Sequence, residues 1–116
     1  MALKINLKAG ERLLIATSRL TVASEGYTTI IIEGDLPVMR ESESITLEQA
    51  QTPRARIYYH MQQFYLSQSA EHMKIVQAIS ETLSDDERAE VQHVLNHVEA
   101  GSIFTALKAA RKFAQF

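Results

Sequence analysis

The chain has 116 residues, of which 46% are hydrophobic and 22% are charged, a composition typical of one soluble globular domain. It contains no cysteine, which excludes disulfides, a thiol nucleophile and a thiolate metal site. The formal net charge of −2 argues against nucleic-acid binding through a broadly basic surface, so such binding would depend on a local basic patch or on a partner.

The first forty residues carry the patterns of short strands. Apolar and polar side chains alternate over residues 3–7, and short apolar runs follow at 13–15 and 20–22. The run "YTTIIIEG", residues 27–34, is rich in β-branched side chains, which favour a strand. Residues 36–39 contain a proline that lacks an amide hydrogen, so we expect them to form an edge strand.

From Thr46 the pattern becomes helical. Thr46 and Gln49 have the spacing of a capping box. The pair Thr52-Pro53 is a stronger start signal, because threonine caps helices and proline suits the first helical position. The helix that begins there is expected to run to about Leu66.

Three further helices are predicted after this one. The second covers residues 70–83, and the third starts after Ser84 with acidic residues that suit a helix N-terminus. Gly101 is expected to end the third helix and Ser102 to cap the last one. The third helix is acidic and the last is basic, which we interpret as two helices that pack side by side.

Strands first and helices after predict an α+β fold. We expect a small antiparallel sheet or sandwich in residues 1–45, followed by a bundle of about four helices in residues 46–116, together forming one compact unit. No apolar run approaches the ~20 residues that cross a bilayer. The N-terminus lacks the apolar block of a secretory signal, so we expect a cytoplasmic protein without a membrane partner.

The segment "TPRARIYYHMQQFYL" gathers arginines and aromatic residues on the first helix. Ile57, Met61 and Phe64, with Tyr65 beside them, form a core stripe at helical spacing. Arg54 and Tyr58 are four residues apart and are predicted to lie together. This pair suits three roles: gripping RNA phosphate while the ring stacks on a base, lying at a protein interface, or forming a structural cation–π contact.

Tyr59 points about 100° away from Tyr58 around the helix, so at least one of the two rings should lie off the core's centre. With Arg40, from the segment before the helix, and Arg56, these residues complete the predicted RNA- or partner-binding set, which is Arg40, Arg54, Arg56, Tyr58 and Tyr59.

The remaining polar clusters carry weaker signals. Glu90, His93 and His97 share one face of the third helix at a spacing that suits a metal, although a solvated face explains them as well. His60 and His72 complete no catalytic triad. The chain has neither a Walker loop nor a GxGxxG motif. We therefore predict that it is not an enzyme and that it binds no cofactor and no metal.

The stretch "LPVMRESESIT" followed by "EQAQTPRARIYYHMQQFYL" resembles the FlbT family of flagellum biosynthesis repressors. Residues 3–11 and the segments "VEAG" and "ALKAARK" near the end match the family pattern in the same order. The chain departs from the pattern at Ala55, where members carry an arginine, and at Ile103-Phe104, where they carry an aromatic pair. It also ends at Phe116, where members often continue.

The resemblance implies a post-transcriptional regulator of flagellin expression in flagellum biogenesis. Such a protein associates with the 5′ untranslated region of flagellin messenger RNA, affects its stability or translation, and acts alongside the partner FlaF. An alternative is a protein-interaction module that binds FlaF, flagellin or a second copy of itself and affects RNA only indirectly. The arginines of the predicted set would contact phosphates, and a tyrosine would stack on a base.

Overall fold

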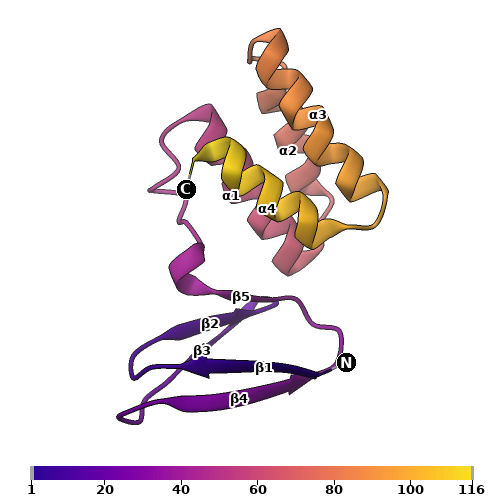
Figure 1. Ribbon diagram of the computed structural model, residues 1–116. Helices are drawn as coiled ribbons and strands as arrows, with labels where there is room; N and C mark the ends of the chain where they lie inside the picture. The colour runs from indigo at the N-terminus through magenta and orange to yellow at the C-terminus, as the bar shows by residue number, and fades with distance from the viewer. Residues whose placement is uncertain (1, 116) are drawn as a thin grey trace. The chain divides into compact units, whose positions relative to one another are not determined.

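The computed structural model describes residues 2–115, and Met1 and Phe116 lie outside the described residues. Within this range, five strands precede four α-helices, which confirms the α+β class expected from the sequence (Figure 1). The chain divides into two compact units, residues 1–44 and 45–116. Each unit has its own set of elements.

The first unit contains two small antiparallel sheets. β1 (Ala2–Leu7) pairs with β4 (Thr28–Glu33) to form a two-stranded sheet. In the second sheet, β2 (Arg12–Ile15) lies between β3 (Ser18–Thr21) and β5 (Val38–Arg40). The strand that follows Pro37 is therefore an edge strand, as its proline predicts.

One apolar core lies between the two sheets. Ile5 and Leu7 of β1 are buried together with Leu13 and Val22. Partly buried side chains from both sheets pack on this core: Ile15, Leu20, Ile30, Ile32 and Val38. The alternation read from residues 3–7 thus places Ile5 and Leu7 inward, whereas Leu3 on the same face is 47% exposed. The unit is a small sandwich.

A short segment at the start of the second unit forms a capping box without a helix behind it. The Thr46 amide donates to Gln49 Oε1 at 2.9 Å, and the Gln49 amide donates to Thr46 Oγ1 at 3.2 Å. The helix begins only at Pro53. Proline holds the preceding Thr52 in an extended conformation, with φ −119° and ψ 159°, so a helix cannot continue through it.

The second unit is a bundle of helices. α1 (Pro53–Ser67) packs against α2 (Glu71–Ser80) and α4 (Ile103–Ala114), and α3 (Asp85–Glu99) packs against α4 (Figure 1). Apolar side chains from all four helices fill the core: Ala55, Ile57, Tyr58, Met61, Leu66, Val76, Val91, Val94, Ala106, Leu107, Ala110 and Phe113. The predicted stripe on the first helix is buried at Ile57 and Met61 and half-buried at Phe64 and Tyr65.

The ends of α3 and the start of α4 test the capping residues that the sequence predicts. Ser84 and Glu87 form a capping box at the start of α3. Gly101 has φ +82° and lies just after α3. Ser102 occupies the N-cap position of α4, as expected, although its side chain makes no cap hydrogen bond. Its carbonyl accepts from the Ala106 amide at 3.0 Å, and its amide donates to the carbonyl of His97 at 2.9 Å, so the residue both closes α3 and begins α4.

Among residues 2–115, the longest helices are too short and too polar to cross a lipid bilayer.

Candidate functional site

The start of α1 positions most of the residues that the sequence singles out. Thr52 accepts a hydrogen bond from the Ala55 amide at 3.0 Å, and Pro53 occupies the first helical turn. The helix period then sends neighbouring side chains in different directions. Residues 54 to 60 consequently divide into a buried set and a surface set, and this division decides which of them are available to a partner.

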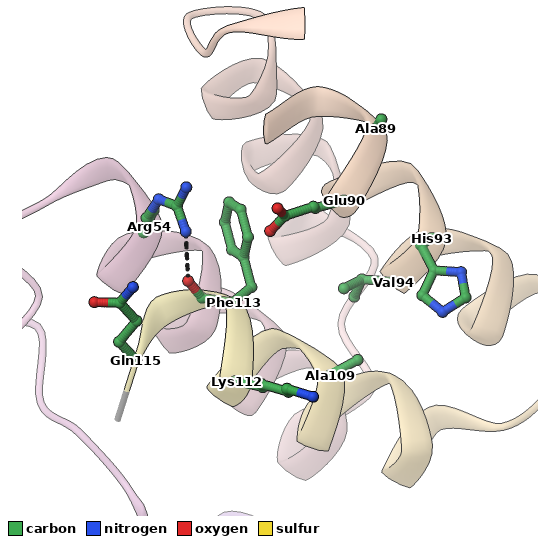
Figure 2. A pocket seen from close by; sticks show the side chains of 9 residues that line it. All are labelled: Arg54, Ala89, Glu90, His93, Val94, Ala109, Lys112, Phe113 and Gln115. Carbon is green, nitrogen blue, oxygen red and sulfur yellow. Dashed lines mark hydrogen bonds between the residues drawn. The ribbon is translucent and has the colours of Figure 1, made fainter. Parts of the chain in front are cut away.

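Arg54 lies in an internal network. Its Nε donates to Glu87 Oε2 at 2.8 Å, and its Nη1 donates to the carbonyl of Phe113 at 2.9 Å. The guanidinium carbon also lies 4.5 Å from the centroid of the Phe113 ring, and Figure 2 shows the two side chains next to each other. Arg54 therefore joins the start of α1 to the start of α3 and the end of α4, which is a structural role.

Glu87 serves two contacts at once. Its carboxylate accepts from the Ser84 amide at 3.4 Å in the capping box and from the Ser84 hydroxyl at 3.0 Å, and it pairs with Arg54. The hydrogen bond from Ser84, followed by the one from Arg54, lowers the pKa of Glu87 below its usual value. The carboxylate is thus held in its charged form by the fold.

Tyr58 is fully buried, with 0% of its surface exposed. The expectation that Arg54 and Tyr58 together present a phosphate-gripping and base-stacking pair is therefore wrong in its geometry. The reason is the phase of the helix, because Tyr58 lies between the directions of Ala55 and Met61, both of which are buried. A sealed ring cannot stack on a base without unfolding part of the bundle.

Arg56 and Tyr59 lie nearer the surface. Arg56 is exposed, and its Nε donates to the carbonyl of Ala50 at 3.4 Å. Among the residues that the structure describes, no carboxylate lies within 4 Å of its guanidinium, so its charge is not neutralised. Tyr59 is half-buried, as expected for the ring that points away from Tyr58.

Arg40 belongs to the first unit. It is half-buried, its Nη1 lies 3.5 Å from Glu11 Oε2, and its Nη2 donates to the carbonyl of Asn6 at 3.1 Å. Its described contacts therefore lie within the sandwich, where it links β5 to β1 and to the turn before β2.

Two histidines that the sequence leaves without a role meet in the structure. His60 Nδ1 on α1 lies 3.1 Å from His72 Nδ1 on α2, and Arg56 lies one turn before His60. The Tyr59 ring meets His60 edge to face, with centroids 5.1 Å apart. Burial first, then the charges of His72 and Arg56, lowers the pKa of His60. The two histidines are twelve residues apart in sequence, so no periodicity signals their contact.

A groove lies between α3 and α4 and reaches Arg54 of α1 (Figure 2). Its volume is about 870 Å³. Val94, Ala109 and Phe113 provide apolar lining, and Glu90, His93 and Lys112 provide charged or polar lining. α3 and α4 pack side by side as expected, although within residues 2–115 no ion pair joins an acid of α3 to a base of α4.

His93 and His97 are stacked edge to face on α3, with ring centroids 4.8 Å apart. Over the part of the chain that the structure describes, no group of three or more His, Cys, Asp or Glu side chains is arranged to hold a metal ion. The three-ligand set considered at Glu90, His93 and His97 therefore does not form in this conformation.

α4 carries an aromatic residue at its surface, Phe104. Phe104 is 51% exposed, and its ring centroid lies 5.8 Å from that of Tyr65. Lys108 Nζ lies 5.1 Å from the centroid of the Phe104 ring. A cation over an exposed ring is suited to contact a base or a protein side chain. The signal in the sequence is that Phe104 lies one position off the apolar stripe that Ile103, Leu107 and Ala110 form on this helix.

Comparison with known proteins places these features in a family. The family model described as "Flagellar protein FlbT" matches residues 3–116. A "Probable flagellum biosynthesis repressor protein FlbT" from Rhodopseudomonas palustris is 32% identical over 116 residues, which cover 96% of this chain and 90% of the relative. No solved structure matches the chain.

Two further relatives carry related names. "Probable flagellum biosynthesis repressor protein FlbT 1" from Bradyrhizobium diazoefficiens is 29% identical over 121 residues, covering 100% of this chain and 82% of the relative. A protein of a Caulobacter species, also named a probable flagellum biosynthesis repressor, is 24% identical over 123 residues, covering 100% of this chain and 93% of the relative. The similarity therefore spans both units of the chain.

Proposed function

Since the chain belongs to the FlbT family of flagellar proteins, we propose that it controls flagellin expression by associating with the 5′ untranslated region of flagellin messenger RNA. This association changes the stability or the translation of the messenger in the cytoplasm. Its regulatory role in flagellum biosynthesis follows from the family, whose curated members are named as repressors. The family is one of regulators, and the chain is not an enzyme.

The observation that supports the RNA proposal is the exposure of Arg56 together with its lack of an ion-pair partner in the described structure. Arg56 is the one arginine of the predicted set in the described structure that is exposed and has no carboxylate partner, whereas Arg54 and Arg40 have ion pairs. Arginine binds phosphate through several N–H donors at once. Tyr59 lies three residues further along α1, is half-buried, and carries an aromatic ring of the kind that stacks on bases. We therefore assign phosphate contact to Arg56 and stacking to Tyr59, and we assign structural roles to Arg54 and Tyr58.

A binding titration of the purified chain against flagellin leader RNA at about 50 mM and about 200 mM salt tests this assignment. Each phosphate contact on a single strand contributes about −0.7 to the slope of log affinity against log salt. Arg56→Ala should weaken binding and flatten the slope by about that amount. Arg88→Ala is the matched control, because Arg88 is an exposed arginine on α3 that already pairs with Asp85. An Arg56→Ala protein with unchanged affinity and slope would remove this surface from the proposal.

A second candidate function is favoured by the groove between α3 and α4. A mixed apolar and charged groove of about 870 Å³ suits a peptide or helix of a protein partner, and FlaF, flagellin and a second copy of the chain are the candidates. In this case the protein would act on RNA only indirectly. Ala109→Glu, which places a larger charged side chain on the groove lining, should release such a partner.

Capture of partners from cell extract, with and without nuclease, separates the two functions. A flagellar protein that is retained after nuclease by the natural chain and lost from Ala109→Glu supports the interaction module. Leader RNA that binds the purified chain alone supports direct association. Arg56→Ala should therefore lose affinity in the RNA titration and keep a captured protein partner. Ala109→Glu should keep its RNA affinity and lose the captured partner.

A further inference from the structure

The contact between His60 and His72 forms a small cluster of groups that can carry positive charge. Their Nδ1 atoms are 3.1 Å apart, and their ring planes are tilted by 31° with centroids 5.4 Å apart. At this distance one Nδ1 donates its hydrogen and the other accepts it, so the accepting Nδ1 carries no hydrogen of its own. Both side chains are half-buried, between α1 and α2.

Arg56 completes the cluster. It lies one helical turn before His60, a spacing at which side chains on a helix are neighbours, and its charge acts on the His60 ring. Its guanidinium makes one described hydrogen bond, to the carbonyl of Ala50, and has no carboxylate within reach among residues 2–115. The cluster therefore brings together one permanent cation and two imidazoles without a compensating anion.

The neighbouring helices do not supply that anion. On α2, the exposed Glu71 is paired with Lys74, with Oε1 and Nζ 3.6 Å apart. The groups whose charges act on His60 are His72, from α2, and Arg56, from its own helix. α4, the other helix that packs against α1, contributes none of them. Burial and these two neighbours together lower the pKa of His60, so the fold disfavours the charged form of this ring.

This arrangement suits an anion better than a metal ion. Within residues 2–115 no Asp, Glu or third His joins the pair to complete a metal-binding group. A divalent cation would also meet the unneutralised Arg56 charge. A phosphate group, in contrast, would receive donors from the guanidinium and from imidazole N–H groups. Its negative charge would also compensate a proton taken up by the histidine pair.

We propose that Arg56, His60 and His72 form a phosphate-group site on α1 and α2, which the backbone of the regulated RNA occupies with uptake of a proton. This inference rests on the proposed RNA function for the source of the phosphate. The proton binds the accepting Nδ1 of the histidine pair. This breaks the Nδ1–Nδ1 hydrogen bond, and both rings then carry a hydrogen on Nδ1 that they can donate to the phosphate. Binding that takes up one proton weakens by up to about tenfold per pH unit above the pKa of the free site.

Histidine ring signals in nuclear magnetic resonance spectra of the full chain test this site directly. Titration midpoints of the rings are measured alone, with inorganic phosphate, with chloride at matched ionic strength, and with leader RNA. We expect phosphate and RNA to raise the midpoint of the His60 and His72 pair, whereas chloride leaves it unchanged. His93 and His97 on α3 form a second close pair and are the internal control, with midpoints that phosphate does not move.

Two variants assign the effect to individual residues. Arg56→Gln should abolish the phosphate-induced shift, and Arg88→Gln, with the same change of charge on α3, should keep it. His72→Gln should leave salt-dependent RNA binding but remove its decrease between about pH 6 and pH 8. Because Arg56 is exposed, its variant is expected to fold even if the His72 variant does not.

The outcomes separate this site from the function on which it rests. RNA binding that is independent of pH, with ring midpoints unmoved by phosphate or RNA, overturns the site and leaves the RNA function standing. A phosphate-induced shift in a chain that binds no leader RNA supports a site for a free phosphate group and overturns the RNA function. A shift with RNA, whether or not inorganic phosphate reproduces it, supports both.

Discussion

Two arginines that lie two residues apart on the same helix should behave in opposite ways. Arg54→Ala removes a hydrogen bond to the carbonyl of Phe113 at 2.9 Å and a contact with the Phe113 ring at 4.5 Å. A hydrogen bond from a charged donor contributes about 1.5 kcal/mol, and a partly exposed cation–π contact about 0.5 kcal/mol. The loss of the Glu87 pair adds to this, so the free energy of unfolding should fall by at least about 2 kcal/mol.

For a chain of this size, a loss of that order lowers the unfolding midpoint by about 10 °C. Arg56→Ala removes an exposed side chain with one long hydrogen bond, and its effect on stability should stay within about 0.5 kcal/mol. Thermal unfolding followed by far-ultraviolet circular dichroism measures both. The RNA titration should give the opposite order, with the larger loss of affinity and salt slope in the stable Arg56 variant.

A double-mutant cycle with Glu87→Gln then tests the cause. Because Arg54 and Glu87 are in contact, the effects of Arg54→Ala and Glu87→Gln on stability should not add. Equal destabilisation by Arg54→Ala and Arg56→Ala, or additive effects of the Arg54 and Glu87 changes, would refute the division of α1 into a structural arginine and a functional one.

Further predictions concern the bundle itself. Gln62 is 3% exposed. Its side-chain Oε1 accepts from the backbone amide of Ile45 at 2.9 Å, and its Nε2 donates to the backbone carbonyl of Ile45 at 3.0 Å. Gln62→Leu leaves both buried backbone groups unpaired and should cost about 3 kcal/mol of stability in chemical unfolding, whereas exposed Gln92→Leu should cost little. The pKa of Glu87 is lowered by folding, so its contribution is present above the ordinary glutamate pKa of about 4.3 and is lost as pH falls through the lower folded value. Glu87→Gln should therefore reduce the slope of stability against pH in that acidic range, and an unchanged acid-unfolding profile would contradict this.

Several features of the fold follow from signals within a few residues. The alternation of residues 3–7 gives β1 its inward face, and Thr52-Pro53 starts α1 where expected. The spacing of Ser84 and Glu87 gives the capping box of α3. These predictions succeed because each element is fixed by hydrogen bonds or side-chain periods that span no more than four residues.

The candidate site is less accessible to such reasoning. The sequence identifies α1 as the helix that gathers arginine and aromatic side chains, and it predicts that at least one of Tyr58 and Tyr59 lies off the core's centre. It does not show which of the two faces inward. The apolar stripe on α1 broadens to include Tyr58 because α2 and α4 both pack on this helix, and a single-face pattern underestimates a helix with two neighbours.

By itself, then, the sequence determined the α+β order, the starts of the helices and the family, because short-range backbone chemistry and a family pattern are both written along the chain. Only the tertiary structure decided that Arg54 is bound to Glu87, thirty-three residues away, and that His60 meets His72 beside Arg56. The physical reason is that pairing of distant side chains depends on which helices pack and at what rotation. That rotation is set by the whole buried core rather than by the residues that finally meet.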